Sequence, residues 1–272
     1  MVLMRDNFAA LLAPGLFNVV FQQLKAWPDI YPKVINRDVS KKRKETTQTV
    51  AGVTILNTKA EGQSVTYMDA QQGYSKDWTH LTYAGGIRIT RETYDDDLYG
   101  VMQKMPKSLA ASLKQALEVS VANVINRGFN SSYTGPDAKV LFATDHPLKT
   151  SGGTDQNTLT TTADLSHTSM ENCLSQLGKT VNDAGLNTYH IPKVLYVPVD
   201  LRWTAATILE SEKKSGTANN DTNSLKAADI DYVVSPYLTD GDQYTIICNE
   251  HEMYLWMRMK PKPEADDDFD TG

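Results

Sequence analysis

The most regular pattern of apolar and polar positions in this chain lies between residues 105 and 127. Apolar residues recur there at four-residue steps, a spacing that places them along one side of an α-helix. The apolar positions are Met105, Leu109, Leu113, Leu117, Val121 and Ile125, with Ala116, Ser120 and Val124 beside them. The polar residues that fall largely off this side are Lys107, Lys114, Gln115, Glu118 and Asn123. The pattern predicts a long helix with one packed side.

The residues at the two ends of this segment suit a helix start and a helix stop. Pro106 fits the first helical turn, where its missing N–H is no loss. Gly128 fits a left-handed position after the last turn. At roughly 1.5 Å per residue, about 22 residues make a rod about 33 Å long. We expect this spine helix, residues 105–127, to be a mechanical element of the fold.

The segment before the spine helix, residues 40–79, is polar and contains only scattered apolar residues. Apolar and polar residues alternate in two short stretches, residues 53–55 and 65–67, which flank a turn-like group at 59–62. This pattern predicts a long antiparallel hairpin with little core of its own. Because an isolated two-stranded ribbon is only marginally stable in water, we expect the hairpin to be braced on a neighbour.

Four consecutive basic residues stand at the start of this hairpin: Lys41, Lys42, Arg43 and Lys44. Such a cluster is compatible with a simple solvated face. It is also compatible with pairing to acidic surfaces of adjacent subunits. The sequence leaves both interpretations open.

The segments on either side of the hairpin are less regular. Residues 1–39 contain two short apolar patches, neither long enough to form a stable helix alone, and are expected to form an arm that docks on another surface. Residues 81–90 suggest a strand interrupted by Gly85 and Gly86. The three acids at 95–97 project in different directions on any regular element, so a solvated turn is expected there rather than a metal site.

A loop-rich stretch at residues 129–163 leads into a region that alternates helix and strand, residues 164–258. The expected elements are helices at 166–181 and 201–209 and strands at 194–199, 230–235, 244–249 and 253–259. We expect a compact α/β domain that is built separately from the spine helix. The acidic, turn-like end of the chain is expected to be flexible or cut short.

Composition narrows the class of protein. The chain has 272 residues, 40% hydrophobic and 22% charged, which is typical of a soluble globular protein. Its formal net charge of −6 argues against a protein whose main task is to grip nucleic-acid phosphates. Cys173 and Cys248 are too few for a disulfide framework and are expected to pack as small apolar residues. No secretory signal or membrane span of about 20 apolar residues is seen, so we expect a cytoplasmic origin and no membrane partner.

Sequence motifs of common enzymes are not found. The chain has no phosphate-binding loop, no dinucleotide fingerprint, no nucleophile elbow and no zinc-protease motif, and its five histidines lack metal-ligand spacing. No cofactor and no metal site is therefore predicted. Asp145 and His146 invite a catalytic interpretation, but no nucleophile stands at a recognisable spacing from them. A hydrolase whose site is assembled only in space stays open as an alternative.

The order of helical arm, polar hairpin, strand, long helix and α/β domain resembles the major capsid proteins of tailed bacteriophages. Three stretches carry the resemblance: EGQSVTYMDAQQGY at 61–74, LTYAGGIRITRETYDDDLYG at 81–100 and LFATDHPL at 141–148. They are most similar to the Mu-like major head subunit group, over nearly the whole chain. Members of that group usually continue past the acidic stretch into a final strand, so the chain is expected to be either truncated or flexible near Gly272.

The resemblance implies an α+β fold of the tailed-phage capsid type. The implied parts are an N-terminal arm (1–39), an extended β-hairpin loop (40–79), a peripheral domain with the spine helix (80–163), an α/β axial domain (164–258) and a return to the peripheral domain (259–272). The implied inter-subunit contacts are Lys41, Lys42, Arg43, Lys44, Lys59, Glu61, Tyr67, Tyr74 and Trp78. The implied packing residues of the spine helix are Leu109, Leu113, Leu117, Val121 and Val124.

The implied function is self-assembly, without catalysis or cofactor, into hexamers and pentamers of an icosahedral head that encloses double-stranded DNA. The implied partners are other copies of the chain, a scaffold or protease, a portal, decoration proteins and, non-specifically, the packaged DNA. The implied location is the virion, after assembly in the cytoplasm of the bacterial host. An encapsulin-like shell, which shares this fold but encloses protein cargo, remains the alternative.

Overall fold

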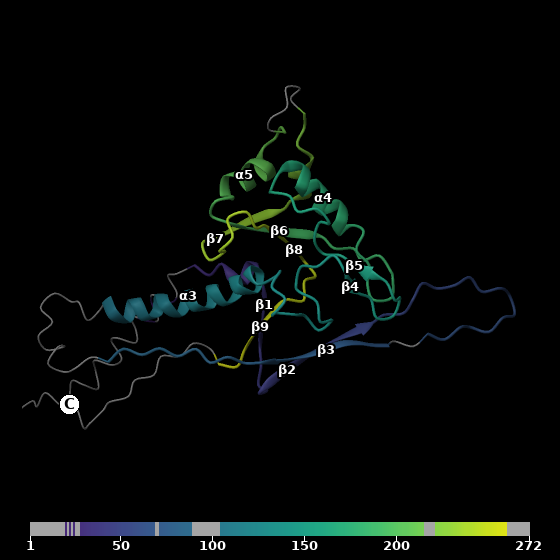
Figure 1. Cartoon of the computed structure of the whole chain (residues 1–272), viewed down its shortest axis with the longest axis horizontal. Coiled ribbons are helices and arrows are strands. Elements are labelled where there is room, and N and C mark those ends of the chain that lie inside the picture. Colours follow the sequence, from purple (N-terminus) through teal and green to yellow (C-terminus); the bar gives the residue numbers. More distant parts are fainter. Residues whose placement is uncertain are drawn as a thin grey trace, which may run out of the picture.

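The chain folds into a mixed arrangement of helices and short sheets. The computed structural model describes residues 20, 22, 24, 28–68, 71–88, 104–214 and 221–259. The elements in chain order are η1 (Tyr31–Lys33), β1 (Asn36–Val39), β2 (Lys44–Ala51), β3 (Gln71–Thr79), α3 (Lys104–Asn126), β4 (His146–Pro147), β5 (Thr154–Asp155), α4 (His167–Leu177), β6 (Pro192–Pro198), α5 (Arg202–Glu210), η2 (Ser224–Ala228), β7 (Asp231–Ser235), β8 (Thr245–Cys248) and β9 (Tyr254–Met257). Figure 1 shows α4 and α5 above the largest sheet, α3 below it and the β2–β3 hairpin lowest.

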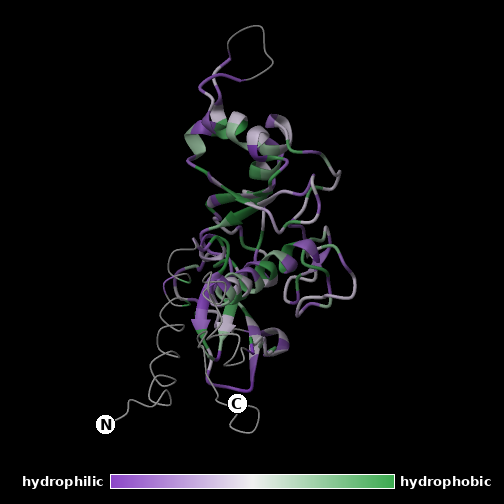
Figure 2. Cartoon of the chain, turned by 90° about the vertical axis from the view of Figure 1, so that its left-hand side faces the viewer, coloured by the Kyte–Doolittle hydropathy of each residue, from purple (hydrophilic) through white to green (hydrophobic). Residues whose placement is uncertain are grey.

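The largest sheet has three strands in the order β7-β6-β8, with β6 parallel to β7 and antiparallel to β8. Successive side chains of a strand point to opposite faces, so the apolar β6 serves two hydrophobic clusters. Leu195 and Val197 pack with α4 and α5, whereas Tyr196 packs with α3. Figure 2 shows hydrophobic residues concentrated in this sheet and the helices beside it. The sheet separates the two hydrophobic clusters.

This arrangement corrects the expectation of an α/β unit built separately from the spine helix. Val121, Ala122 and Ile125 of α3 share one buried cluster with Tyr196 and Ile247 of the sheet. The α/β unit and the C-terminal half of α3 therefore have a common core. The sequence pattern did not reveal this contact, because periodicity shows that a face is apolar but not which element covers it.

The helix α3 has nearly the predicted bounds, but its packed side is rotated. Glu118, predicted to lie off the packed side, is only 3% exposed, while Val124, a predicted packing residue, is 42% exposed. Val121 is buried as predicted, and Leu117 packs partly buried against the same cluster. The other predicted packing residues, Leu109 and Leu113, are half-buried. The rotation arises because the segment at residues 28–35 covers the Glu118 side.

That covering segment corrects a second expectation, the arm at residues 1–39. From residue 28 onwards this stretch belongs to the body of the fold, since Tyr31, Val34 and Ile35 are buried. Strand β1 follows and pairs in parallel with β9, which was expected to lie in the α/β unit. The pairing joins residues more than 200 positions apart, and no local pattern indicates such a partner. The expected apolar patch around residues 8–12 lies outside the described residues.

The end of α3 corrects the expected role of Gly128. Among the described residues, the glycines with positive φ are Gly62, Gly152 and Gly185, so Gly128 is not a left-handed cap. A Cβ at Gly128 would instead lie 2.3 Å from the ring of Phe142. The N–H of Phe142 donates to the carbonyl of Gly128 at 2.9 Å. Glycine is needed here because the loop after the helix returns directly over it.

The helix α4 begins as predicted and ends early. The hydroxyl of Ser166 accepts the N–H of Ser169 at 3.1 Å, which satisfies a donor of the first turn. The helix ends at Leu177, where Gly178 follows, although the apolar spacing continues to Val181. Val181 forms an isolated antiparallel bridge with Asn187 instead.

Two expected strands do not form. Residues 52–68, where alternation suggested pairing, form no strand, and neither do residues 80–88. The last two residues of the strand expected at 81–90 lie outside the described residues, as do the acidic turn at 95–97 and the acidic end of the chain beyond residue 259. Alternation over two or three residues is too short to select a partner.

Candidate assembly surface

The expected hairpin is present, with its paired part nearer the body than predicted. Strand β2 pairs antiparallel with β3, from Lys44 opposite Thr79 to Ala51 opposite Gln71. The residues of both strands are largely polar, and most are exposed. The hairpin runs below the body of the molecule and continues beyond it as a long loop (Figure 1). It is therefore a projecting element and not part of either core.

The outer loop, defined here as residues 52–68, carries the most exposed apolar side chains of the hairpin. The exposed fractions are 46% for Val53, 72% for Ile55, 81% for Leu56, 62% for Val65 and 91% for Tyr67. A turn reverses the chain between them, where Gly62 has a φ of 82°. Exposed apolar groups gathered on one projecting element are typical of a protein–protein contact.

The predicted contact residues of the hairpin fall into two groups. Lys59, Glu61 and Tyr67 are exposed on the outer loop. Tyr74 and Trp78 already have contacts within the chain. The ammonium of Lys149 lies 5.5 Å from the centre of the Tyr74 ring, and the indole N–H of Trp78 donates to the hydroxyl of Thr47 at 2.8 Å. Trp78 therefore stabilises the pairing of the two strands, and Tyr74 contributes to the contact between the hairpin and the body.

The basic cluster at residues 41–44 is exposed, and part of its charge is paired within the hairpin. Lys42 lies 3.4 Å from the Glu45 carboxylate, and Lys44 forms an ion pair with Asp77 on the opposite strand. The hydrogen bond from Lys44 and a second one from Thr46 lower the pKa of the Asp77 carboxyl. Lys41 and Arg43 stay exposed at the turn.

A serine and a histidine meet at the base of the hairpin, but not in the geometry of a catalytic triad. The hydroxyl of Ser40 donates to the Glu45 carboxylate at 2.6 Å, and Nε2 of His80 lies 3.1 Å from the Ser40 hydroxyl oxygen. The hydrogen bond from Ser40 is the main cause of the lowered pKa of the Glu45 carboxyl. Because the serine proton is directed to the carboxylate, His80 is not its base. Ser40 is also only 3% exposed. Its contacts with Glu45 of β2 and with His80, directly after β3, connect the two strands at their base.

The Asp145–His146 pair considered from the sequence is not formed. Asp145 makes an ion pair with Lys139, and this contact lowers the pKa of its carboxyl. Nδ1 of His146 lies 2.6 Å from the carboxylate of Asp137 instead. Nε2 of His146 is buried and has no hydrogen-bond partner among the described residues. The histidine therefore connects two loops and has no nucleophile in hydrogen-bond reach within the described part of the chain.

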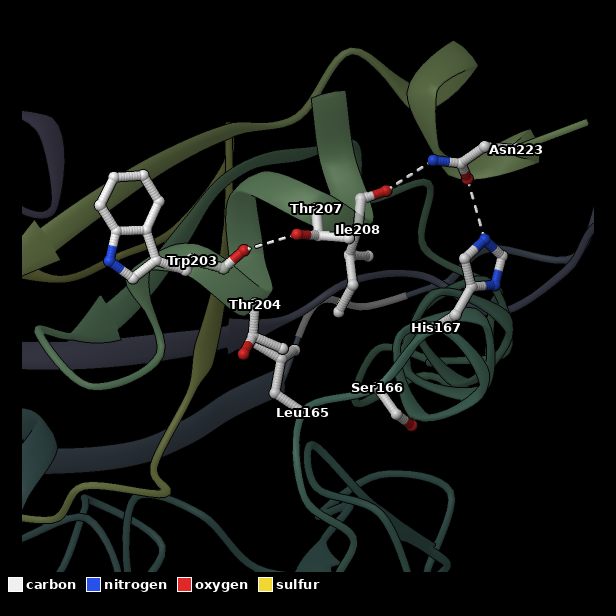
Figure 3. Close-up of a pocket in the computed structure, with 8 residues that line it drawn as sticks. All are labelled: Leu165, Ser166, His167, Trp203, Thr204, Thr207, Ile208 and Asn223. Atoms are coloured by element: carbon white, nitrogen blue, oxygen red, sulfur yellow. Dashed lines mark hydrogen bonds between the residues drawn. The ribbon is translucent and has the colours of Figure 1, made fainter. Parts of the chain in front are cut away.

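A shallow cavity of about 450 Å³ lies between the start of α4 and α5, and its polar groups serve the fold (Figure 3). His167 Nε2 lies 2.8 Å from the side-chain oxygen of Asn223, whose amide group donates to the Ile208 carbonyl at 2.7 Å. The Thr207 hydroxyl donates to the Trp203 carbonyl at 2.8 Å. Trp203 itself is 73% exposed at the rim. These contacts join α4, α5 and the segment before η2.

Two further observations concern metal sites and membrane spans. No group of three or more potential metal ligands among His, Cys, Asp and Glu occurs within the described ranges. None of the helices in the described part of the chain is both long enough and apolar enough to cross a membrane. The hairpin remains the most prominent candidate surface.

Comparison with known proteins identifies the family of the sequence and the fold of the structure. A family model described as phage capsid protein matches residues 73–272. The fold is similar to the bacteriophage JBD30 capsid, with a TM-score of 0.60 and 15% identity, covering 79% of this chain and 92% of that chain. It is also similar to the JBD30 procapsid, with a TM-score of 0.57 and 17% identity, covering 86% of this chain and 100% of that chain.

A third similar structure is the JBD30 capsid decorated with minor capsid protein trimers, with a TM-score of 0.59, 15% identity and coverage of 79% of this chain and 92% of that chain. No individually curated protein matches the sequence. At these identities the structural likeness establishes the fold, and the family match establishes membership. This chain belongs to the phage capsid protein family and is a shell-forming major capsid protein.

Proposed function

We propose that copies of this chain form the hexamers and pentamers of an icosahedral tailed-phage head, and that the outer loop of each copy docks on a neighbouring copy. The observation that carries the proposal is the set of apolar side chains on residues 52–68, which are exposed by 46–91%. The three motifs of the sequence favour the Mu-like major head subunits as the nearest group. The exposed basic residues Lys41 and Arg43, with Lys59 and Glu61, would add charged contacts around the apolar ones.

The proposed division of labour follows the tailed-phage capsid plan. Residues 40–79 are the extended loop, α3 and the loops around it form the peripheral domain, and the sheet with α4 and α5 forms the axial domain. The arm is confined to the residues before 28, because residues 28–39 pack in the body. We assign β9 to the peripheral part, since it pairs with β1.

The physical basis of assembly is burial of these side chains between copies. Fully burying one large apolar side chain contributes about 1.5–3 kcal/mol before the entropy of ordering the loop is subtracted. A loop from one copy on a different surface of the next is a heterologous contact, and such contacts generate closed rings when the rotation closes. Each interface can therefore be modest, because the shell repeats it many times.

The further partners are proposed by chemistry and by likeness to the JBD30 assemblies. A procapsid stage and minor capsid protein trimers occur in that phage, and we propose comparable scaffold or protease, portal and decoration partners here. Contact with packaged double-stranded DNA is expected to be weak and non-specific, since the chain carries a net charge of −6. Assembly is proposed to occur in the cytoplasm of the bacterial host.

We propose a purely structural role without catalysis. The two arrangements that invited an enzymatic interpretation are used otherwise: Ser40 donates to Glu45, and His146 pairs with Asp137. Substituting His146 with alanine is expected to disturb the loops that it joins. Loss of a hydrolytic activity with folding and assembly intact would support the enzyme alternative.

The proposed docking is tested by placing one charge on the outer loop. Ile55→Asp, Leu56→Asp and Tyr67→Asp are each expected to reduce the yield of shells at least tenfold, because a buried unpaired carboxylate is costly. Gln63→Asp, at the exposed turn of the same loop, is the matched control and is expected to assemble normally. Particles are counted by negative-stain electron microscopy, and circular dichroism of the unassembled protein checks its fold.

Normal assembly by all three variants would overturn the docking proposal. The contents of the shells separate the two kinds of container. Co-purification of one dominant enzyme with the particles, in place of DNA-packaging proteins, would favour an encapsulin-like compartment over a phage head.

A further inference from the structure

We propose that Lys149 and Lys76 are positioning residues that set the angle at which the hairpin leaves the body. They act at a β-bulge, where Gly73 and Tyr74 of β3 lie opposite Thr49 of β2. The importance of this angle for shell formation rests on the proposed docking of the outer loop. The hydrogen bonds that the two lysines make between the hairpin and the body lie within a single chain, so they are tested separately from assembly.

The bulge interrupts the register between β2 and β3. Pairing is continuous from Lys44 opposite Thr79 to Gln48 opposite Ser75 and resumes with Val50 opposite Gln72. Between these pairs β3 has two residues, Gly73 and Tyr74, and β2 has only Thr49, so the extra residue lies on β3. Thr49 lies opposite the bulge. Its hydroxyl accepts the N–H of Tyr74 at 2.8 Å and takes the place of a ladder partner. A Cβ on Gly73 would lie 2.1 Å from that hydroxyl and 2.8 Å from the backbone oxygen of Thr49. Glycine is therefore required for the strands to close around the bulge.

Two lysines connect the hairpin to the loops that flank β4, one from each side. Lys149, in the loop after β4, donates to the carbonyl of Gly73 at 3.0 Å. Lys76, on β3, donates to the carbonyl of Thr134 and lies 4.8 Å from the centre of the Trp78 ring. Both ammonium groups thus make charge-assisted hydrogen bonds to backbone carbonyls, and each also faces an aromatic ring. The hairpin is therefore attached to the body at two separate contacts, Lys149 with Gly73 and Lys76 with Thr134.

These contacts coincide with the boundary between the covered and the exposed parts of the hairpin. Ala51 is 1% exposed and Gly73 is buried, whereas the outer loop that follows is exposed throughout nearly its whole length. Eight extended residues reach about 26 Å at about 3.3 Å per residue, so a rotation of about 10° at the bulge would move the tip by about 4–5 Å. The two lysines therefore control where the apolar side chains of the loop are presented.

The proposal is tested with Lys149→Met, Lys76→Met and the double variant, which keep most of the side-chain length and remove the charge and the donors. Lys179→Met is the matched control, because the side chain of Lys179 is exposed and lies away from the hairpin in the sequence. Amide hydrogen exchange of β2 and β3 is measured on unassembled protein. The double variant is expected to exchange at least tenfold faster there, with an unchanged midpoint of global unfolding and a severalfold lower shell yield.

Lys149→Arg, which retains a cationic donor, is expected to restore most of the protection. Gly73→Ala keeps both lysines but disturbs the bulge, and with it the carbonyl that accepts from Lys149, and is expected to reproduce the effect of the double variant. Exchange in the double variant equal to that of the wild type and of Lys179→Met would overturn the proposal.

The assembly results separate this proposal from the docking proposal. Faster exchange with a normal shell yield, in a chain whose outer-loop aspartate variants do not assemble, would overturn the positioning role and leave docking intact. Normal assembly of the aspartate variants would overturn docking, and the exchange data alone would then decide whether the lysines hold the hairpin.

Discussion

At the scale of single residues, the buried carboxylate of Glu118 connects the spine helix to the start of the body. Its Oε1 accepts the N–H of Ile30 at 2.6 Å and the N–H of Tyr31 at 3.1 Å. These are donors at the first turn of η1, which the short helix cannot satisfy itself. Lys114, one turn earlier on α3, forms an ion pair with Asp29 beside them. The polar residues on this side of α3 are therefore structural and hold η1 in the core.

Replacing Glu118 with alanine is expected to lower the free energy of unfolding by about 2–3 kcal/mol, because two backbone donors would be left without an acceptor in a buried place. Glu118→Gln keeps one acceptor oxygen and should cost less. Gln115→Ala, on the exposed side of the same helix, is the control and should change stability by less than about 0.5 kcal/mol. Chemical denaturation of unassembled protein measures the three values, and an unaffected Glu118→Ala variant would contradict the assigned role.

At the scale of elements, the hairpin is stabilised by cross-strand polar contacts where most proteins would use a core. Lys44 and Asp77 form an ion pair across it, the hydroxyl of Thr46 reaches the same carboxylate at 2.5 Å, and Trp78 reaches Thr47. Such pairs contribute little each, but several in succession can hold a two-stranded ribbon that has one end seated on the body. The hairpin is therefore sensitive to the charge state of its carboxylates.

The lowered pKa of Asp77 predicts how the hairpin responds to acid. A carboxyl whose pKa is lower in the folded state than in the unfolded state, about 3.9, stabilises the fold above that pH. This contribution is lost as the pH falls through the folded-state pKa. The protection factors of the β2 and β3 amides, which are corrected for the intrinsic pH dependence of exchange, are therefore expected to fall below pH 4. Asp77→Asn should exchange faster than the wild type at pH 6, and the difference should shrink towards pH 3. A constant difference would show that the carboxylate charge is not involved.

At the scale of the whole molecule, two buried clusters on opposite faces of one sheet carry the stability, and the hairpin lies outside both. Replacing residues 53–67 with a short Gly/Ser turn keeps every β2–β3 pair. We expect global stability to stay within about 0.5 kcal/mol of the wild type, with no shells seen by electron microscopy or light scattering. A Gly/Ser loop of the original length is the control for length and should also fail to assemble. Shells formed by the shortened chain would contradict the proposed docking.

Local patterns predicted the elements well, since each element depends on neighbours in the chain. The spine helix was expected at 105–127 and is found at Lys104–Asn126, because its hydrogen bonds and its apolar spacing both repeat within four residues. The strand at 194–199 and the helix at 201–209 were found within about two residues of their expected bounds. The hairpin was expected from its polar composition, although its paired part lies at Lys44–Ala51 and Gln71–Thr79.

What the sequence by itself determined is therefore the spine helix, the approximate places of α4, α5 and strands β6 to β9, the projecting polar hairpin and the capsid class of the chain. Only the tertiary structure decided which sides meet: Glu118 as a buried acceptor, β1 beside β9, and the spine helix under the sheet. The same is true of the bulge and the lysines that hold the hairpin. The physical reason is that these contacts join distant segments, whose pairing depends on shape and on unsatisfied donors that local periodicity does not encode.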